Sequence, residues 1–315
     1  MEEKLPVTKP FSHLCKSLRL ASSLNFEIEE GTYQAMVDHQ SLLKTVPRER
    51  LVVEVIKCSS STTAWARGLK LLQDTKLHRY VFPDVSEEAF SEAARVARNV
   101  ADHVSCSSSS VFEGGDEAMV TGVRLGFLLP LEESEEKDYK AFGLQPGILK
   151  SHKQGLMSVH LLHQMETSYR RKNMNNNNNK DHGDHVKGDE NEASAVAAVG
   201  GSVISKMLDF YSNPEEIVDH CLLWYSQRFP PERAEAFMKR HEEQRTRMAK
   251  SIGLRRSNTR IIPSKALEAQ GIRPGPEMGE LLRLAEEIAA EKNLFDQESL
   301  LQLLKQSPIW PRGEL

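Results

Sequence analysis

The sequence predicts an all-α protein, an elongated multi-helix array interrupted by a disordered Asn-rich insertion. Apolar residues recur at helical spacing in one segment after another along most of the 315 residues. Short stretches rich in Ser, Asn, Gly or Pro separate these segments, as turns do. Residues 173–192 break the pattern with asparagines and charged residues, which is typical of disorder.

The composition is that of a globular protein without a membrane segment. Hydrophobic residues make up 39% of the chain and the formal net charge is −4, so any nucleic-acid surface has to be local. No apolar run approaches the ~20 residues of a membrane span, and the start, Met-Glu-Glu-Lys, has no secretory or transit pattern. The four cysteines stand far apart, which argues against a zinc site and a disulfide framework. We therefore expect an intracellular protein, either mitochondrial or cytoplasmic, with no membrane partner.

In the first half of the chain, apolar spacing predicts helices over residues 11–24, 27–40, 48–57, 65–77 and 87–104. Segment 118–131 is the most apolar and could be a strand or a buried helix; its helical context favours a helix. An amphipathic helix is expected over residues 152–171.

The helix expected over residues 48–57 has two distinct faces. Its apolar stripe consists of Leu51, Val52, Val55 and Ile56. On the other side, Glu54 lies four residues after Arg50 and three before Lys57, so opposite charges can pair along the helix. From these residues alone, a partly buried amphipathic helix with solvated ion pairs is the expected structure.

After the insertion, helices are expected over residues 203–211, 214–229, 231–251 and 297–306. Asn213 and Pro214 suit the cap and first position of the second of these. The stretch 255–262 is expected to be irregular, and a turn rich in Gly and Pro at 269–276 should lead into a helix that reaches residue 288.

Basic residues gather in the C-terminal third of the chain. Such a cluster suits phosphate binding, although Glu242 and Glu243 are interleaved with it, as on a solvated helix face. The candidate RNA-binding residues are Arg255, Arg256, Arg260, Lys265, Arg273, Lys239, Arg240 and Arg247. The aromatic residues Tyr211, Trp224, Tyr225 and Phe229 could stack on bases, but their spacing is more typical of a helical core.

Four segments, in order, resemble the class II CCA-adding tRNA nucleotidyltransferases and the related bacterial poly(A) polymerases. Leu18 to Phe26 is similar to the helix that ends the family's catalytic half and begins its neck. Glu49 to Lys57 matches the neck motif ERxxxExxK. Residues 65–83 resemble the helix and turn that follow the neck motif, and residues 271–279 resemble the GPxxG tail motif.

The resemblance implies the organisation of the chain. It suggests a neck-like helical domain over residues 1–84, a body-like domain over 85–172, the insertion over 173–200 and a tail-like RNA-binding domain over 201–315. Glu49, Arg50, Glu54 and Lys57 would then be structural residues of the neck. The family grips tRNA mostly through phosphate contacts and shape, so RNA, and tRNA first, is the expected partner.

The sequence departs from the family where chemistry is done. It contains no DxD metal-binding pair, and the positions of the nucleotide-selecting EDxxR motif hold Lys9, Pro10 and His13. We therefore expect no catalytic or metal-binding residue and no cofactor in this chain. Mg²⁺ and CTP or ATP would enter only with a separately supplied catalytic head.

Three functions are compatible with this pattern. The leading prediction is an RNA-binding pseudoenzyme of the family that lacks the catalytic head, is inactive alone and works within an RNP. The second is a fragment, or one half, of a split CCA-adding enzyme in tRNA 3′-end processing, with its head encoded elsewhere. The third is a helical scaffold whose leucines, Leu300, Leu301, Leu303 and Leu304, bind a partner helix.

Overall fold

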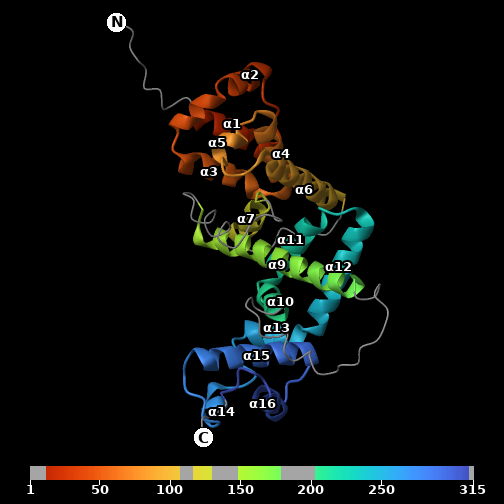
Figure 1. The fold of residues 1–315 in the computed structure, drawn as a ribbon. Coiled ribbons are helices and arrows are strands. Elements are labelled where there is room, and N and C mark those ends of the chain that lie inside the picture. The colour runs from red at the N-terminus through yellow and green to blue at the C-terminus, as the bar shows by residue number, and fades with distance from the viewer. Residues whose placement is uncertain (1–11, 107–115, 130–147, 179–202, 312–315) are drawn as a thin grey trace. The chain divides into compact units, whose positions relative to one another are not determined.

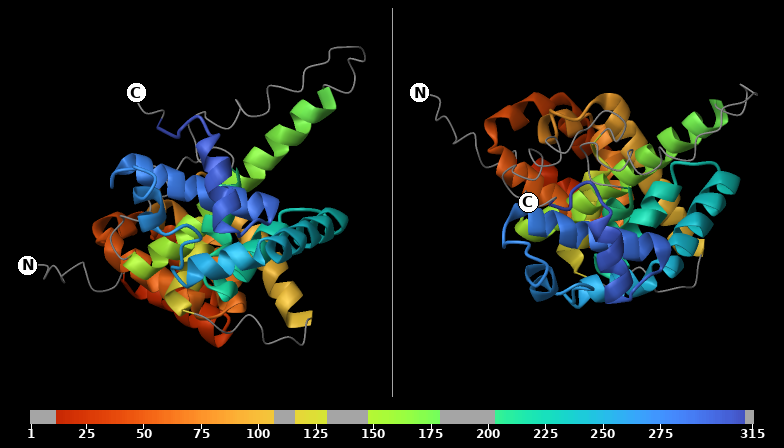
Figure 2. Two further views of the ribbon diagram at one scale, coloured as in Figure 1. Left: turned by 90° about the horizontal axis from the view of Figure 1, so that it is seen from below. Right: turned by 60° about the horizontal axis from the view of Figure 1, so that its bottom comes forward.

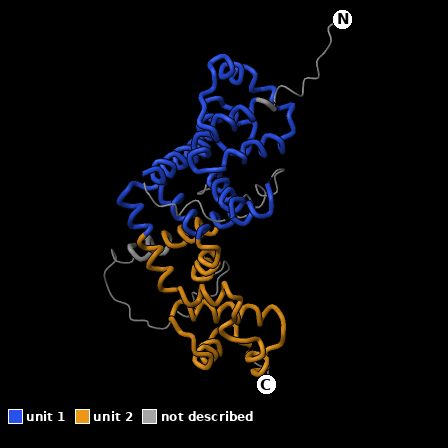
Figure 3. The backbone as a smooth tube through the Cα atoms, turned by 180° about the vertical axis from the view of Figure 1, so that it is seen from behind, with its two compact units in different colours: residues 1–160, 216–238 blue, residues 161–215, 239–315 orange. Residues whose placement is uncertain are grey.

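The computed structural model describes residues 12–106, 116–129, 148–178 and 203–311, and every regular element within those ranges is a helix (Figure 1). Figure 2 gives the same helices from two further sides. The all-α prediction is therefore confirmed. The chain divides into two compact units, residues 1–160 with 216–238 and residues 161–215 with 239–315 (Figure 3).

Most elements of the first unit precede residue 130. They are α1 (Ser12–Leu24), α2 (Glu30–Asp38), η1 (Gln40–Thr45), α3 (Arg48–Ile56), η2 (Lys57–Ser60), α4 (Thr62–Asp74), α5 (His78–Val81), α6 (Glu87–Cys106) and α7 (Glu117–Gly126). Residues 150–160 of α9 (Lys150–Asn178), most of α11 (Glu215–Ser226) and residues 231–238 of α12 (Pro231–Arg247) also belong to this unit. The apolar segment expected over 118–131 is thus a helix, as its context predicted.

The core of the first unit forms around α4. This helix begins at Ser61, whose hydroxyl accepts a hydrogen bond from the Ala64 N–H at 3.1 Å. It packs against α1 on one side and α6 on the other, while α3 packs against α1. Trp65 and Phe90 are fully buried there. The neck-like segment is therefore held by ordinary helix packing.

Helices α7 and α9 approach each other closely at two glycines. A β-carbon on Gly122 would lie 2.0 Å from the carbonyl oxygen of His152, and one on Gly155 would lie 1.9 Å from that of Met119. Neither distance is possible for a side chain, so the close contact of the two backbones requires glycine at both positions.

The second unit contains the later helices. They are α10 (Val203–Tyr211), residues 239–247 of α12 (Pro231–Arg247), α13 (Ala249–Arg256), α14 (Ser264–Glu268), α15 (Pro276–Lys292) and α16 (Gln297–Lys305). α15 contacts α10, α13, α14 and α16. Pro276 starts α15 at its first turn, and Asn293 ends it in the left-handed conformation, with φ 51°. A core that includes Leu267, Leu281 and Leu300 fills this unit.

Three sequence predictions are wrong in detail. The helix expected over 231–251 breaks at Met248, whose φ of −95° and ψ of 4° leave the helical region. α13 then continues to Arg256, so Arg255 and Arg256 lie in a helical turn and not in an irregular stretch. α9 extends to Asn178, past the predicted start of the insertion at residue 173; the remainder of that insertion, 179–200, lies outside the described residues.

Three of the four leucines expected to bind a partner helix in a scaffold protein pack within this chain, and the fourth, Leu303, is half-buried. Leu300 and Leu304 are fully buried, and Leu301 packs against the same core of α14, α15 and α16. The period of the leucines reflects the packing of α16 within this chain. No described helix is both long and apolar enough to cross a membrane. The predicted four-segment division remains a prediction.

Candidate RNA-binding surfaces

Glu54 is the centre of the neck motif. Its carboxylate accepts a hydrogen bond from Arg19 Nε at 3.0 Å and one from Lys57 Nζ at 2.8 Å. The expected pair of Glu54 and Lys57 is therefore present. The other expected partner, Arg50, is replaced by Arg19 of α1, because Arg50 points elsewhere. Glu54 thus ties α3 to α1 through an ion pair that its own helix does not supply.

The surroundings of Glu54 favour its charged form. Burial alone would raise the pKa of this carboxyl, but the hydrogen bonds and charges of Lys57 and Arg19 outweigh it and lower the pKa below its usual value. Glu49, at the start of α3, is exposed. The geometry gives Glu54 and Lys57 a structural task and leaves Arg50 without one.

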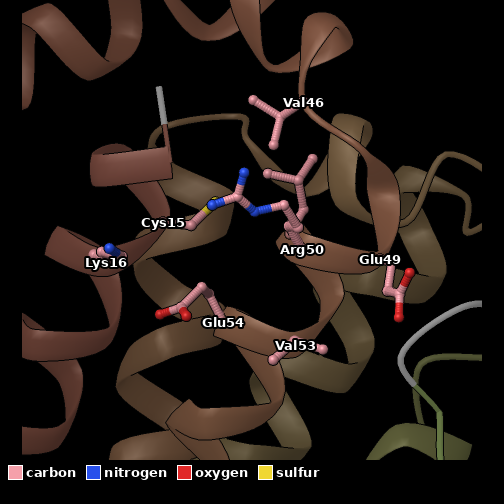
Figure 4. A pocket seen from close by; sticks show the side chains of 8 residues that line it. Cys15, Lys16, Val46, Glu49, Arg50, Val53 and Glu54 are labelled. Carbon is pink, nitrogen blue, oxygen red and sulfur yellow. The ribbon is translucent and has the colours of Figure 1, made fainter. Parts of the chain in front are cut away.

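Arg50 reaches into a pocket between α1 and α3, with a volume of about 210 Å³ (Figure 4). Its walls include Cys15 and Lys16 of α1, Val46 just ahead of α3, and Val53 and Glu54 of α3. In Figure 4 the guanidinium extends toward the side on which Cys15 lies, while the Glu49 carboxylate points away. Sequence reasoning treated Arg50 as a structural residue and missed this pocket, which arises only when α1 folds beside α3.

Three of the eight candidate RNA-binding residues have structural partners in the second unit. Arg240 pairs with the buried Glu166 and stacks over the Tyr169 ring at 4.3 Å. Arg255 pairs with Asp209 at 2.6 Å. Arg256 donates to the carbonyl oxygens of Tyr211 and Asn213 at 2.9 and 2.8 Å, which secures the end of α10.

The other five candidates have exposed side chains: Lys239, Arg247, Arg260, Lys265 and Arg273. Arg260 donates to the Ser264 hydroxyl at 3.1 Å. The remaining four make no side-chain hydrogen bond or ion pair with another described residue. Arg260, Lys265 and Arg273 come from the stretch around α14, and Lys239 and Arg247 from α12. Of the interleaved acids, Glu242 is paired with Arg245 at 3.0 Å and so is partly neutralised.

The aromatic residues are mainly core residues, as their spacing predicted. Tyr211, Trp224 and Tyr225 are each at most 1% exposed. Trp224 and Tyr225 pack around Phe127, with ring centroids 5.7 and 6.4 Å away. These three rings are therefore unavailable for stacking on bases.

The structure also contains a buried polar network that sequence reasoning missed. The Tyr211 hydroxyl lies 2.7 Å from His241 Nδ1, and His241 Nε2 lies 3.1 Å from Glu166. The hydroxyl is also 3.3 Å from Gln244 Oε1. This network joins α9, α10 and α12 within the second unit. No local sequence motif indicates this network, because the hydrogen-bonded residues are 30 and 75 positions apart.

Comparison with known proteins finds similarity in the N-terminal helices. Residues 25–88 match the family described as "Probable RNA and SrmB- binding site of polymerase A". The CCA-adding enzyme of Streptococcus thermophilus is 40% identical over 76 residues, 24% of this chain and 18% of that enzyme. That of Lactococcus lactis subsp. cremoris is 33% identical over 79 residues, 25% of this chain and 19% of the enzyme.

A likeness in fold covers much more of the chain. The Thermotoga maritima CCA-adding enzyme, solved in complex with tRNA, aligns with a TM-score of 0.51 over 94% of this chain and 61% of that one. The identity is 14%, so this comparison concerns the fold alone. The sequence alignments, by contrast, span about a fifth of each curated relative.

Proposed function

We propose that the chain binds structured RNA, with tRNA as the favoured partner. Its N-terminal helices are similar to those of the CCA-adding enzymes and poly(A) polymerases. The observation that carries this proposal is the match of residues 25–88, which hold α2 to α5, to a probable RNA-binding site. The solved relative with the same helical fold is a tRNA complex, which supports the choice of tRNA.

Exposed cations of the second unit supply phosphate contacts in this proposal. Lys239, Arg247, Arg260, Lys265 and Arg273 keep their charges at the surface, where they can neutralise phosphates and release counterions. Arg240, Arg255 and Arg256 mainly hold the fold. RNA recognition of this kind reads backbone shape more than base sequence.

These 315 residues do not transfer nucleotides by themselves in our proposal. The support is the lack of any DxD pair in the sequence, together with Lys9, Pro10 and His13 at the positions of the EDxxR motif. Nucleotidyl transfer needs carboxylates that hold divalent metal ions. Mg²⁺ with CTP or ATP would therefore act only alongside a separate catalytic head.

Two assays on the purified full chain test the proposal. Gel retention should show tRNA bound more tightly than a DNA duplex of similar length. Incubation with tRNA, radiolabelled CTP or ATP and Mg²⁺ should leave the tRNA unextended. Equal retention of DNA and tRNA would contradict the preference for RNA. Robust incorporation of labelled nucleotide into tRNA would contradict the proposed inactivity of the chain alone.

A second candidate function is one half of a split CCA-adding enzyme in tRNA 3′-end processing. It is favoured by one observation: the fold likeness covers 94% of this chain but only 61% of the Thermotoga maritima enzyme. An in-frame exon upstream of Met1 with a GGxVRD motif would establish it. A stop codon close upstream, with no separate head protein that restores CTP addition when mixed in, would exclude it.

A further inference from the structure

The pocket between α1 and α3 is not explained by RNA binding to the second unit. It belongs entirely to the first unit, and its volume of about 210 Å³ corresponds to about seven water molecules at their liquid volume. A phosphate group has five heavy atoms, so it fits with room for part of an attached sugar.

Charge in and around the pocket is unbalanced. Arg50 is exposed and Lys16 half-buried, and neither makes a side-chain hydrogen bond or ion pair with another described residue. Two carboxylates also line the pocket, Glu49 and Glu54. The Glu49 side chain points away from the Arg50 guanidinium (Figure 4), and Glu54 is already shared by Arg19 and Lys57 at 3.0 and 2.8 Å. The two pocket cations are therefore not neutralised by Glu54.

The Cys15 thiol and the two valines of the walls carry no negative charge. Burial raises the pKa of the Cys15 thiol to about 12, so the sulfur stays protonated and uncharged at neutral pH. Val46 and Val53 add apolar surface, which weakens screening by water. α3 starts after Pro47 without a side-chain cap, so the positive end of its dipole adds to the local field.

We propose that this pocket binds a phosphate group, held by the two-pronged guanidinium of Arg50 and by the ammonium group of Lys16. Arginine offers parallel N–H donors that match phosphate oxygens, and lysine adds a point charge. When the phosphate is a phosphodiester of bound RNA, the inference rests on the proposed function. When it is a free phosphomonoester, the pocket stands independently of RNA binding.

The first experiment follows the Nε–Hε NMR signal of Arg50 in the full chain labelled with ¹⁵N-arginine. Its assignment comes from the loss of that signal in Arg50→Met. Inorganic phosphate should shift the signal saturably, and sodium chloride at equal ionic strength should not. The signal of Arg98, an exposed arginine of α6 without an ion pair, should not move in either titration. Identical responses of Arg50 to phosphate and chloride would overturn the proposal.

The second experiment separates the two sources of phosphate. Arg50→Met should weaken the binding of AMP about tenfold if the pocket takes phosphomonoesters, since a hydrogen bond to a charged group is worth about 1.5 kcal/mol or more. A similar loss for tRNA would assign the pocket to the RNA backbone. Arg98→Met should change either affinity less than twofold. No loss for AMP or tRNA in Arg50→Met would count against the proposal.

Folding and function are checked separately. Arg50→Lys keeps the charge and removes the guanidinium, so it should retain part of the phosphate affinity, while thermal unfolding of all variants should match the wild type. If the wild-type chain fails to bind tRNA, the proposed function is wrong, but the phosphate titration of Arg50 still decides whether the pocket exists as a binding site.

Discussion

Single residues of the first unit divide into those that hold the fold and those that are free to bind. Glu54 has a side chain only 14% exposed and two cationic partners, Arg19 and Lys57. Arg50, one turn earlier on the same helix, has none among the described residues. Sequence spacing predicted a pair between Arg50 and Glu54, because residues four apart on a helix are neighbours. Arg19 takes that place from 35 residues away, which spacing within one helix cannot reveal.

The Glu54→Gln substitution should destabilise the first unit by about 1–2 kcal/mol, because it removes a partly buried charge from two hydrogen-bonded cations. Urea unfolding of the full chain, followed by tryptophan fluorescence, measures the change. Glu49→Gln, on the exposed start of the same helix, is the matched control and should stay within about 0.5 kcal/mol of the wild type. Equal effects of the two substitutions would contradict the structural role of Glu54.

In the second unit, the network of Glu166 and His241 should make stability depend on pH. Burial lowers the pKa of His241, although hydrogen bonding to Glu166 opposes it. Burial alone would raise the pKa of Glu166, but its hydrogen bonds and charge interactions with His241 and Arg240 lower it below the usual value. Both groups bind protons more weakly in the folded state. The stability linked to them is therefore complete above the unfolded pKa of histidine, about 6.5, and declines as the pH falls below it.

The expected outcome is a lower thermal midpoint at pH 5.5 than at pH 7.5, with a smaller difference in His241→Gln. Glutamine is not protonated in this pH range, so the substitution removes the contribution of the histidine to the pH dependence, while carboxylates elsewhere in the chain titrate as before. The measurement is the midpoint of unfolding at the two pH values in both proteins. If the variant is as acid-sensitive as the wild type, His241 does not contribute to the pH dependence.

Between elements, the backbones of α7 and α9 approach each other closely at Gly122 and Gly155. Gly122→Ala should destabilise the protein by about 1–3 kcal/mol, because its new methyl group would collide with backbone and not with a movable side chain. Gly253→Ala in α13 is the control, since nothing lies within 4 Å of its added β-carbon. That change should stabilise the chain by about 0.4–1 kcal/mol. Chemical unfolding of both variants tests the contrast, and an equal effect would contradict the close approach.

Most helices were predictable from sequence, because their apolar residues follow a clear period and residues such as Ser61 and Pro276 mark their starts. The break at Met248 was not, because neither glycine nor proline stands there. Met248 and Ile252 are both buried, and such burial cannot be read from the local sequence. Because α13 continues to Arg256, Arg255 and Arg256 lie at a helix end, and their partners lie on other elements.

The candidate site was predictable only in part. The sequence shows that basic residues gather late in the chain, but charge alone does not separate Arg240, which is paired with Glu166, from Lys239, which is exposed beside it. Neighbouring positions on a helix face different sides. Which of them meets a buried acid depends on where α9 lies. The structure therefore leaves five of the eight candidates exposed and bound to neither an acid nor a backbone carbonyl among the described residues.

Across the whole molecule, we expect RNA binding and folding to depend on different cationic side chains. Arg256→Met should lower the thermal midpoint, because the carbonyl oxygens of Tyr211 and Asn213 lose their donor. Lys265→Met should leave the midpoint unchanged and weaken RNA binding. Differential scanning calorimetry and filter binding on the same preparations would measure both effects. A loss of stability in Lys265→Met without loss of binding would reverse the assignment of these residues.

The proposal that exposed cations of the second unit bind RNA is tested most directly by the affinity of the full chain for tRNA as a function of salt. The account predicts that log affinity falls linearly with log salt concentration, and that the double variant Lys265→Met with Arg273→Met reduces the slope by about one to two, as phosphate contacts are lost. The control is Arg98→Met, whose slope should equal that of the wild type. Binding that is independent of salt, or a double variant with an unchanged slope, would contradict the proposal that these exposed cations hold RNA.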